Sequence, residues 1–392
     1  MVAGALAEAG DCRVPGIAEE VSLDGQVIQE ICNERPRRVY SECTQIEFRE
    51  YDVPAPAPGG IVAAVTQTNV CGSEVHMWKG EFGNRGVMPG HEMSGRIQAL
   101  GAGVRADWAG VEVKEGDRIA PVYFTVCNRC ANCTTGNHAA CTGRVMGARH
   151  PDQPPHFTAT FATHYFVKPD QHFYRVPDNV PDSVASSANC AMSQVFWSLD
   201  RARLAYGETL LVLGAGGLGL HAMAIAKARG ARVIAIDGVD LRLRQARRFG
   251  ADETSDLREH PDVESRTQRL RELGFGSPDV VLEVAGVPDA FMDAIKMVRN
   301  GGRIVEVGNI AARLTVQLPP ALITFKSIEI TGVATYPPHY LKKSLDFLAL
   351  HMEKYPYLEL SDATFSLSQA AEALDKSERR EITRAGLLPT EA

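Results

Sequence analysis

The stretch Val212–Gly219 constrains this chain more than any other part of its sequence. Apolar residues from Leu210 to Leu213 predict a short buried strand. The turn that follows has the pattern G-x-G-x-x-G, formed by Gly214, Gly216 and Gly219. A glycine turn directly after a buried strand indicates a phosphate-binding loop, although a strand–helix turn that binds nothing can share the pattern.

The residues after the turn complete a larger pattern. Leu220 to Arg229 is predicted to be a helix that stops at Gly230, and Val233 to Ile236 is predicted to be a strand that ends in Asp237. Strand, glycine turn, helix, strand and acid, in this order, are the dinucleotide-binding fingerprint of a Rossmann domain. We therefore expect an α/β fold that binds a dinucleotide.

Each part of the fingerprint has a physical purpose. Gly214 permits the tight turn, Gly216 lets the backbone approach a pyrophosphate, and Gly219 lets the helix pack close to the strand. The unpaired N–H groups at the helix N-terminus favour an anion. Asp237 is suited to hold two ribose hydroxyls, and its carboxylate disfavours the 2′-phosphate of NADP, so the expected cofactor is NAD.

Further cofactor contacts are expected around this turn. Arg242 is a candidate for a ribose contact, the alternative being a solvated helix face. The loops at Ala285 and Gly308 follow predicted strand ends, where such sheets bind ligands, although both are also ordinary turn sequences. The expected cofactor-binding residues are Gly214, Gly216, Gly217, Leu218, Gly219, Asp237, Arg242, Ala285 and Gly308.

Length and composition narrow the remaining classes of protein. A chain of 392 residues is long enough for two domains, and its 45% hydrophobic and 23% charged residues are typical of a globular protein. The net charge of −7 argues against nucleic acid or an anionic membrane as a partner. No apolar run approaches the roughly 18 residues of a membrane span, and the first ten residues do not resemble a secretory signal. We therefore expect a cytoplasmic location.

The cysteines indicate metal binding. There are nine, several are clustered, and clustering without a secretion signal favours metal over disulfides. One polar segment holds Cys127, Cys130, Cys133 and Cys141. This spacing predicts a closed tetrahedral zinc site with a structural role. An iron–sulfur cluster is the weaker alternative, because no other redox feature accompanies the segment.

A second candidate metal site is spread over separate loops. Cys71 and His91 each stand near an acid, and this combination suits zinc. Ser73 and His76 lie close to Cys71 and are suited to pass a proton outward, although His76 alone is also consistent with a surface histidine. Cys190 is an isolated cysteine, and its residue type alone favours a buried core thiol.

The rest of the chain shows two kinds of organisation. Between residues 38 and 70 short β-like runs alternate with turns, and 51–60 is a proline-rich connector. After the fingerprint, strands and helices alternate, which predicts a parallel sheet covered on both faces. We predict strands at 279–284, 303–307 and 328–333, helices at 290–298, 340–352 and 371–374, and a closing strand at 384–389.

Two segments remain open to more than one interpretation. Residues 1–36 are either an extension packed beside the body or a disordered tail, and 26–32 within them is either a strand or a helix. The segment 149–165, rich in His, Pro, Thr and aromatic residues, is either a solvated loop or a pocket wall. We favour the pocket wall for some of its residues.

Four motifs occur together in this chain: C-G-S-x-x-H from Cys71, G-H-E from Gly90, the four-cysteine segment, and the glycine fingerprint followed by an acid. On these motifs the chain resembles the zinc-dependent alcohol dehydrogenases of the medium-chain dehydrogenase/reductase family, from about Arg38 onward. The resemblance implies a Rossmann NAD-binding domain that interrupts a partly barrel-like, GroES-like β catalytic domain. The implied domains are an N-terminal extension (1–37), the catalytic domain (38–190), the NAD-binding domain (191–334) and a return to the catalytic domain (335–392).

The resemblance also implies roles for individual residues. Cys71, His91 and Cys190 correspond to the ligands of a catalytic zinc. Glu92 corresponds to an acid beside that zinc, and His76 to the outer end of a proton relay. Ser73 corresponds to the hydroxyl that binds the substrate oxygen, and Cys127, Cys130, Cys133 and Cys141 correspond to the ligands of a structural zinc.

Three positions depart from the family pattern. Glu74 stands where Asp usually contacts the ligand histidine, and its additional methylene changes the geometry of that contact. Gly72 stands where some members have Arg near the pyrophosphate. Asn309 stands where an apolar residue is more usual near the nicotinamide carboxamide.

The implied activity is reversible hydride transfer between an alcohol and NAD, with two zinc ions per chain. A reductase of conjugated C=C bonds on the same scaffold is the alternative within enzymes. A non-catalytic zinc- and nucleotide-binding protein is the alternative from another class. The resemblance further implies a small-molecule substrate and a homodimer or homotetramer built through the sheet of the nucleotide domain.

Overall fold

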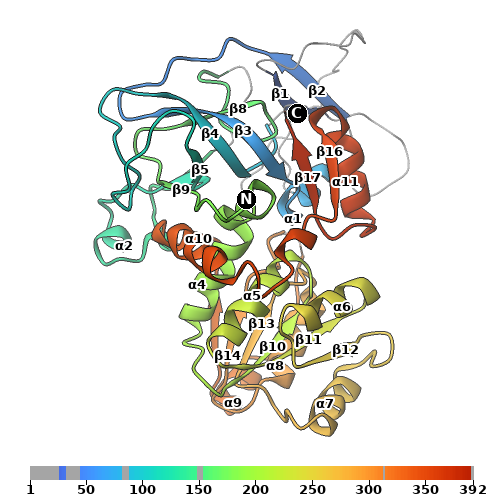
Figure 1. Ribbon diagram of the computed structural model, residues 1–392. Coiled ribbons are helices and arrows are strands. Elements are labelled where there is room, and N and C mark those ends of the chain that lie inside the picture. Colours follow the sequence, from blue (N-terminus) through green and yellow to red (C-terminus); the bar gives the residue numbers. More distant parts are fainter. Residues whose placement is uncertain (1–25, 32–44, 82–87, 148–152, 312–313, 390–392) are drawn as a thin grey trace, which may run out of the picture.

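Two large β-sheets divide the chain into an upper and a lower lobe (Figure 1). The computed structural model describes residues 26–31, 45–81, 88–147, 153–311 and 314–389. Within this part, a six-stranded sheet forms the core of the lower lobe and a seven-stranded sheet that of the upper lobe. None of the helices described is both long and apolar enough to cross a membrane.

The fingerprint strand lies near the centre of the lower sheet. Its strands are all parallel, in the order β12-β11-β10-β13-β14-β15, so the chain reverses direction of travel across the sheet between β10 and β13. In such sheets ligands bind beyond the carboxyl ends of the strands at this reversal. The strands are β10 (Thr209–Leu213), β11 (Arg232–Asp237), β12 (Glu253–Asp256), β13 (Val280–Glu283), β14 (Arg303–Glu306) and β15 (Glu329–Gly332).

Helices cover both faces of this sheet, as the sequence predicted. Alternate strand residues pack to opposite sides: Leu210 and Val212 belong to one apolar cluster, and Leu211 and Leu213 to another. Burial on both faces explains why these strands are continuous apolar runs. The helices of this lobe are α4 (Ser193–Arg201), α5 (Gly217–Ala228), α6 (Asp240–Arg248), α7 (Val263–Glu272), α8 (Pro288–Met297) and α9 (Pro320–Lys326).

The fingerprint helix α5 begins at Gly217, earlier than the predicted start at Leu220. Glycine is a poor helix former, so its first turn gave no helical signal in the sequence. The structure shows why glycine is required there. A Cβ on Gly219 would lie 2.1 Å from the carbonyl oxygen of Gly214, and Gly214 itself has φ of +100°.

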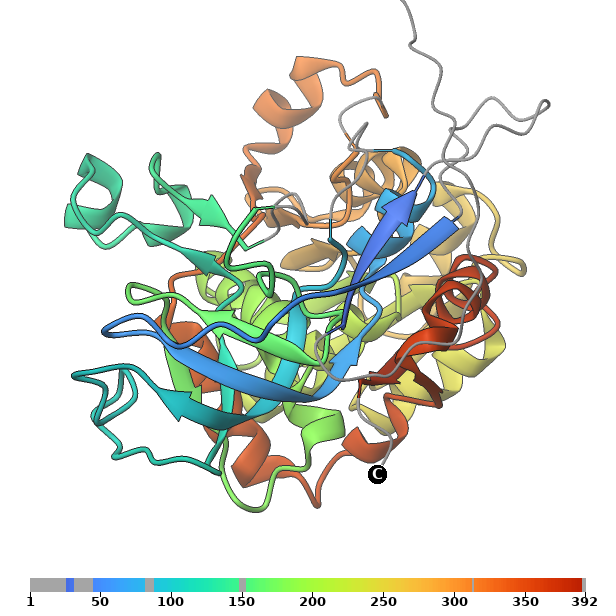
Figure 2. The same cartoon turned by 90° about the horizontal axis from the view of Figure 1, so that it is seen from above.

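The upper sheet is antiparallel except at one edge. Its order is β16-β17-β3-β4-β5-β9, with β8 also paired to β3, and only β16 and β17 are parallel to each other. Figure 2 shows this lobe from above. The strands are β3 (Ile61–Asn69), β4 (Glu92–Leu100), β5 (Arg118–Pro121), β8 (His164–Val167), β9 (Phe173–Arg175), β16 (Ala363–Ser366) and β17 (Ala385–Leu388).

Smaller elements complete the upper lobe. Two two-stranded sheets join β1 (Gln26–Ile31) to β2 (Gln45–Glu50) and β6 (Phe124–Thr125) to β7 (Val145–Met146). The segment 26–31 is therefore a strand and not a helix. Two of the nine cysteines, Cys12 and Cys32, lie in the predicted N-terminal extension outside the described residues. The helices are α1 (Gly72–Trp78), α2 (Ala131–Thr134), α3 (Asp182–Ala185), α10 (His339–His351) and α11 (Ala370–Glu378), with short helical turns at His138–Ala140, Ala188–Met192, Tyr357–Glu359 and Leu367–Gln369.

The C-terminal segment of the described chain returns to the upper lobe. β17 pairs with β3, with Leu387 opposite Thr68, so the predicted closing strand is confirmed. Helix α10 packs on α4 where the two lobes meet (Figure 1). The predicted domain boundaries at 37, 190 and 334 stay predictions.

Candidate active site

Three separate elements bring the predicted ligands Cys71, His91 and Cys190 together. Cys71 is the N-cap of α1, directly after strand β3, and His91 directly precedes β4, the partner strand of β3. Cys190 lies in the π-helical turn Ala188–Met192 that leads into α4. Side chains up to 119 positions apart in the sequence therefore converge at the junction of the lobes.

The geometry of these three side chains fits a zinc ion. The Sγ atoms of Cys71 and Cys190 are 3.9 Å apart, and His91 Nε2 is 3.0 Å from Cys190 Sγ. Tetrahedral zinc with Zn–S bonds of about 2.3 Å places two sulfur ligands about 3.8 Å apart. Contact with the Cys190 thiol lowers the pKa of Cys71 well below its usual range, against the opposing effect of burial. None of the six described cysteines forms a disulfide.

Glu74 orients two of the ligands from behind. Its Oε1 is 2.5 Å from His91 Nδ1, and its Oε2 accepts the backbone N–H of Cys71 at 3.1 Å. The additional methylene relative to Asp therefore does not prevent the contact with His91. A carboxylate on Nδ1 leaves Nε2 as the imidazole nitrogen that is free for a metal.

Asn189 connects the loops of His91 and Cys190. Its Nδ2 donates to the carbonyl oxygens of His91 and Pro121, each at 2.9 Å. The backbone carbonyl oxygen of Asn189 accepts a hydrogen bond from the hydroxyl of Tyr336, a residue that follows the nucleotide sheet. The position of Cys190 thus depends on contacts from both lobes.

Glu92 lies beside the ligands but is already paired. It is fully buried, its carboxylate accepts from the Arg384 guanidinium, and Asn69 Nδ2 donates to it at 3.2 Å. Burial raises the pKa of Glu92 to about 7, although the charge of Arg384 favours the ionised form. Glu92 can join Cys71, His91 and Cys190 as a fourth ligand only by giving up part of this pairing.

A cavity of about 420 Å³ opens in front of the three ligands. It is lined by Cys71, Ser73, His76, His91 and Cys190, and also by residues that follow the carboxyl ends of β13 and β14. The latter include Ala285, Gly286 and Gly308. From the segment 149–165, Thr158 and Tyr165 line this cavity, as the pocket-wall interpretation expected for part of it.

A larger groove of about 980 Å³ continues from this cavity along the glycine turn. Gly214, Gly216, Gly217, Leu218, Asp237, Arg242 and Ala285 line it. A Cβ on Gly216 would meet nothing closer than Arg242 at 4.0 Å, so the backbone there is open to a ligand. Gly219 does not line the groove, because it packs against Gly214.

Asp237 stands at the end of β11 within this groove. Its carboxylate accepts the backbone N–H groups of Ala215 at 2.8 Å and Val239 at 2.9 Å. Arg242 Nη1 lies 3.9 Å from Asp237 Oδ2. These bonds fix the acid beside the glycine turn, where a ribose is expected.

His76 occupies the junction of the cavity and the groove, since it lines both. Its Nδ1 pairs with Glu81, which also contacts Lys79 Nζ at 3.1 Å. Burial raises the pKa of Glu81, but the hydrogen bonds from His76 and Lys79 outweigh this effect and lower it overall. Ser73 lines the cavity only, with its Oγ 3.4 Å from Glu74 Oε2.

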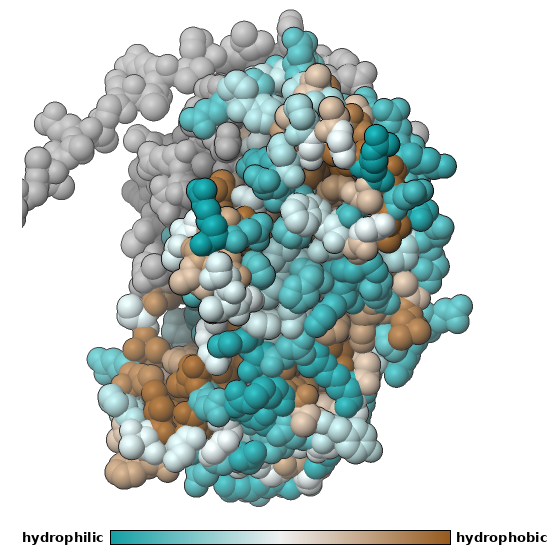
Figure 3. Space-filling model, turned by 90° about the vertical axis from the view of Figure 1, so that its left-hand side faces the viewer, coloured by the Kyte–Doolittle hydropathy of each residue, from teal (hydrophilic) through white to brown (hydrophobic). Residues whose placement is uncertain are grey.

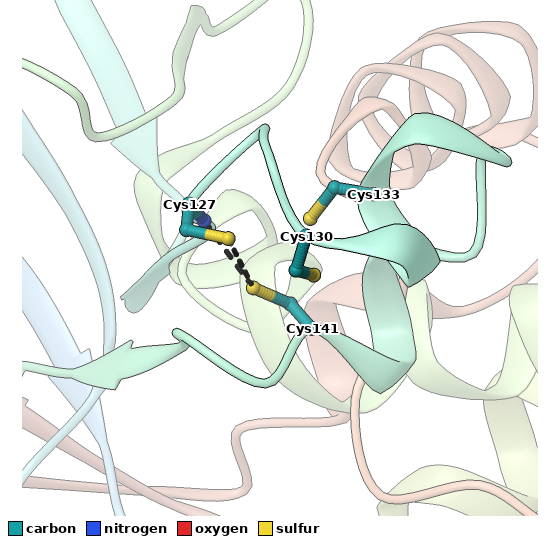
Figure 4. Close-up of side chains that lie close together, drawn as sticks. All are labelled: Cys127, Cys130, Cys133 and Cys141. Atoms are coloured by element: carbon teal, nitrogen blue, oxygen red, sulfur yellow. Dashed lines mark hydrogen bonds between the residues drawn. The ribbon is translucent and has the colours of Figure 1, made fainter.

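The four clustered cysteines converge as a second group around α2 (Figure 4). The Sγ atoms of Cys127 and Cys141 are 3.5 Å apart, and all four sulfurs lie within 4.8 Å of one another. Backbone N–H groups of Cys133 and Thr142 lower the pKa of Cys130 to about 5. Four thiols with backbone support for thiolates fit a closed tetrahedral zinc site.

Several residues of the site carried no signal in the sequence. Arg384 meets Glu92 across 292 positions, and its Nη1 lies 2.6 Å from the position of a Cβ on Gly217. The Arg384 guanidinium therefore faces the glycine turn. Gly72, where some family members have Arg, has no side chain that could bring a charge to the same place. Glu81 and Asn189 were also missed, and only their tertiary contacts identify them.

The fold and the two cysteine-containing sites together define a zinc-binding dehydrogenase, and comparison with known proteins agrees. Residues 57–178 match the alcohol dehydrogenase GroES-like domain, and residues 217–349 match the zinc-binding dehydrogenase domain. The chain belongs to the zinc-dependent alcohol dehydrogenases of the medium-chain dehydrogenase/reductase family.

Individual relatives show how widely the similarity extends. The chain is 33% identical to 5-exo-hydroxycamphor dehydrogenase of Pseudomonas putida over 89% of its own length and 96% of that protein. It is 31% identical to L-threonine 3-dehydrogenase of Anaeromyxobacter sp. (strain K) over 73% of its length and 79% of that protein. An alcohol dehydrogenase structure from Thermotoga maritima has the same fold, with a TM-score of 0.82, 24% identity, and coverage of 93% of this chain and 99% of that one.

Proposed function

We propose that this oxidoreductase is an NAD-dependent alcohol dehydrogenase with a catalytic zinc at Cys71, His91 and Cys190. One observation carries the proposal: a single cavity is lined both by this ligand set and by the strand ends of the nucleotide-binding sheet. A metal site with three protein ligands leaves a coordination position for substrate, and the strand ends are where the redox-active end of a dinucleotide binds.

The chemistry divides between bound groups and the chain itself. Zinc bound there supplies a Lewis acid that acidifies an alcohol, and NAD supplies the hydride acceptor. Ser73 Oγ would accept a hydrogen bond from the alcohol hydroxyl inside the cavity. His76, which lines both cavity and groove, would release the proton to solvent, and the Glu81 carboxylate at its Nδ1 would stabilise the protonated ring.

NAD is the proposed cofactor because of Asp237. Its carboxylate is held by two backbone N–H groups and keeps lone pairs for ribose hydroxyls. A 2′-phosphate at that place would meet this negative charge, although Arg242 nearby offsets part of the repulsion. We further propose a second, structural zinc at Cys127, Cys130, Cys133 and Cys141.

The cavity favours an uncharged substrate. Among its described lining residues there is no Lys or Arg, and its carboxylate and imidazole groups, Glu74, His76 and His91, already have partners. L-threonine, the substrate named for one relative, carries a carboxylate and an ammonium that would lose hydration without a counter-charge. Met77, Met88, Tyr123 and Ile310 instead offer apolar walls, so we propose a compact apolar alcohol.

The test combines metal analysis with steady-state kinetics on purified protein. We expect about two zinc ions per chain. We also expect oxidation of uncharged alcohols with NAD, little activity with L-threonine, and a preference for NAD over NADP that Asp237→Ala reduces. His91→Ala should abolish turnover but retain NADH binding, measured by fluorescence. His351→Ala, on the last turn of α10 and outside both cavities, should retain activity.

The outcomes separate the alternatives. Full turnover by His91→Ala would remove the zinc mechanism. Reduction of conjugated alkenes without alcohol oxidation would identify the other enzyme class. NADH binding without turnover of any alcohol would indicate a non-catalytic binding protein.

A further inference from the structure

Two carboxylates that the proposed mechanism does not use, Glu283 fully buried and Glu306 half-buried, stand side by side at the carboxyl end of the lower sheet. Glu283 ends β13 and Glu306 ends β14, and the two residues are direct partners in the register of these parallel strands. Neighbouring residues in register point to the same face, so their side chains meet. The loops that follow both strands line the cavity.

Glu283 holds the first of these loops. Its Oε1 accepts the backbone N–H of Ala285 at 2.7 Å and of Gly286 at 3.0 Å. Gly286 has φ of +70°, and a Cβ there would lie 2.8 Å from the carbonyl oxygen of Gly308. The two loops are therefore packed against each other, and Glu283 fixes the position of one of them.

Asn309 and Glu306 hold the second loop and join it to the first. Glu306 Oε1 accepts the backbone N–H of Asn309 at 2.9 Å and its Nδ2 at 3.1 Å. The same Nδ2 donates to Glu283 Oε2 at 3.1 Å. One side-chain amide thus bridges two carboxylates, and each carboxylate also binds loop backbone.

The charges of this cluster do not balance if both acids are ionised. Glu283 is fully buried, and its described partners are Glu306, the Asn309 amide and the N–H groups of Ala285 and Gly286, with no cation among them. Burial, and then the charge of Glu306, raise the pKa of Glu283 to about 8. Two adjacent carboxylates without a cation retain one proton between them.

We propose that Glu283 and Glu306 share one proton and act as a pair of positioning residues, which hold both loops in the arrangement that receives the nicotinamide end of the cofactor. This inference rests on the proposed function for the identity of the cofactor. The description of the carboxylate cluster itself does not depend on the proposed function. When the shared proton is lost, two negative charges face each other and the loops are pushed apart.

The experiment measures NADH binding without substrate, by fluorescence titration from about pH 6.5 to about pH 9.5. For the natural chain the Kd should be constant to about pH 8 and then rise, by at most about tenfold per pH unit. In Glu306→Gln the amide can donate to an ionised Glu283, so the rise should disappear. Glu329→Gln is the matched control, since Glu329 lies exposed on β15 and pairs with Arg203. It should behave as the natural chain does.

Urea unfolding at several pH values gives a readout that does not need the cofactor. A raised pKa means that the folded chain keeps a proton that the unfolded chain loses between about pH 4.5 and pH 8. The free energy of unfolding should therefore fall as pH rises through this range, and it should fall less steeply in Glu306→Gln.

Each possible result either supports or overturns the inference. A pH-independent Kd in the natural chain, or the same rise in Glu306→Gln, overturns the inference. If the chain binds no NADH at any pH, the proposed function fails, and an equal pH slope of unfolding in Glu306→Gln and the natural chain then overturns the shared proton as well.

Discussion

At the scale of single residues, Glu74 departs from the Asp of the family pattern but makes the expected contact with the ligand histidine. Its longer side chain reaches His91 Nδ1 and the backbone N–H of Cys71 at once. The N-cap position of Cys71 on α1 explains this double contact, because Glu74 lies in the first turn of that helix. One carboxylate therefore orients two of the three proposed ligands.

We predict that Glu74→Ala weakens zinc binding by about 10–100-fold, because the histidine loses the partner that fixes its ring orientation. The measurement is zinc retention against a graded series of chelator concentrations. Glu115→Ala, in an exposed loop, provides the control. Unchanged zinc retention in Glu74→Ala would show that the ligands are positioned by the backbone alone.

Site residues that belong to local sequence motifs could be predicted, whereas residues that act through partners distant in sequence could not. Cys71, His91 and the four clustered cysteines belong to local motifs, so the sequence could indicate them. Cys190 has no local motif, and only family resemblance indicated it. Arg384 and Asn189 act through partners that are distant in sequence, and nothing near either residue in the chain distinguishes it from an ordinary polar residue.

At the scale of elements, the segment from Cys127 to Cys141 has little apolar support of its own. It contains only the short helix α2 and one helical turn, and most of its side chains are exposed or half-buried. A segment with so small a core requires another source of stability, and the proposed zinc bound to four thiolates would provide it.

We predict that Cys130→Ser lowers the zinc content from about two ions to about one per chain and makes this segment sensitive to protease. NADH binding should persist, because none of the four cysteines lines the groove. Thr134→Ser keeps the hydroxyl bonded to the α2 backbone and should resemble the natural chain. Equal zinc content in Cys130→Ser would contradict a structural zinc site.

Among the elements, strong periodicity was easier to detect than short or polar segments. The sequence indicated β10, β11, β13, β14, β15 and α10 with small errors at the ends. It did not indicate α7, in which charged residues dominate, or β12, whose residues Glu253–Asp256 have low strand propensity. Tertiary pairing with β11 makes β12 a strand.

At the scale of the whole molecule, the lower lobe presents an apolar surface near the edge of its sheet. Helix α9 buries none of its residues fully, Phe325 is 86% exposed, and the adjacent β15 is an edge strand. Figure 3 shows apolar residues gathered on the lower part of one face of the molecule. Surfaces of this kind mark interaction sites in soluble proteins.

We predict that this surface joins two copies of the chain, in a homodimer or within a homotetramer, and that Phe325→Glu lowers the mass measured by light scattering to that of a smaller assembly. A buried glutamate without a partner is unfavourable at an interface. Tyr206→Glu is the control, since Tyr206 is also 86% exposed but lies outside α9 and β15. A monomeric natural chain, or an unchanged mass for Phe325→Glu, would contradict the prediction.

The pairing of β17 with β3 has a consequence for how the protein is made. Translation produces β3, Cys71 and Glu92 long before the strand that flanks β3 and before Arg384, which lies 292 positions after Glu92. Throughout that interval β3 has an open sheet edge, and Glu92 lacks its counter-charge. The candidate zinc site can reach its final electrostatic environment only after Arg384 has been made and β17 has paired with β3.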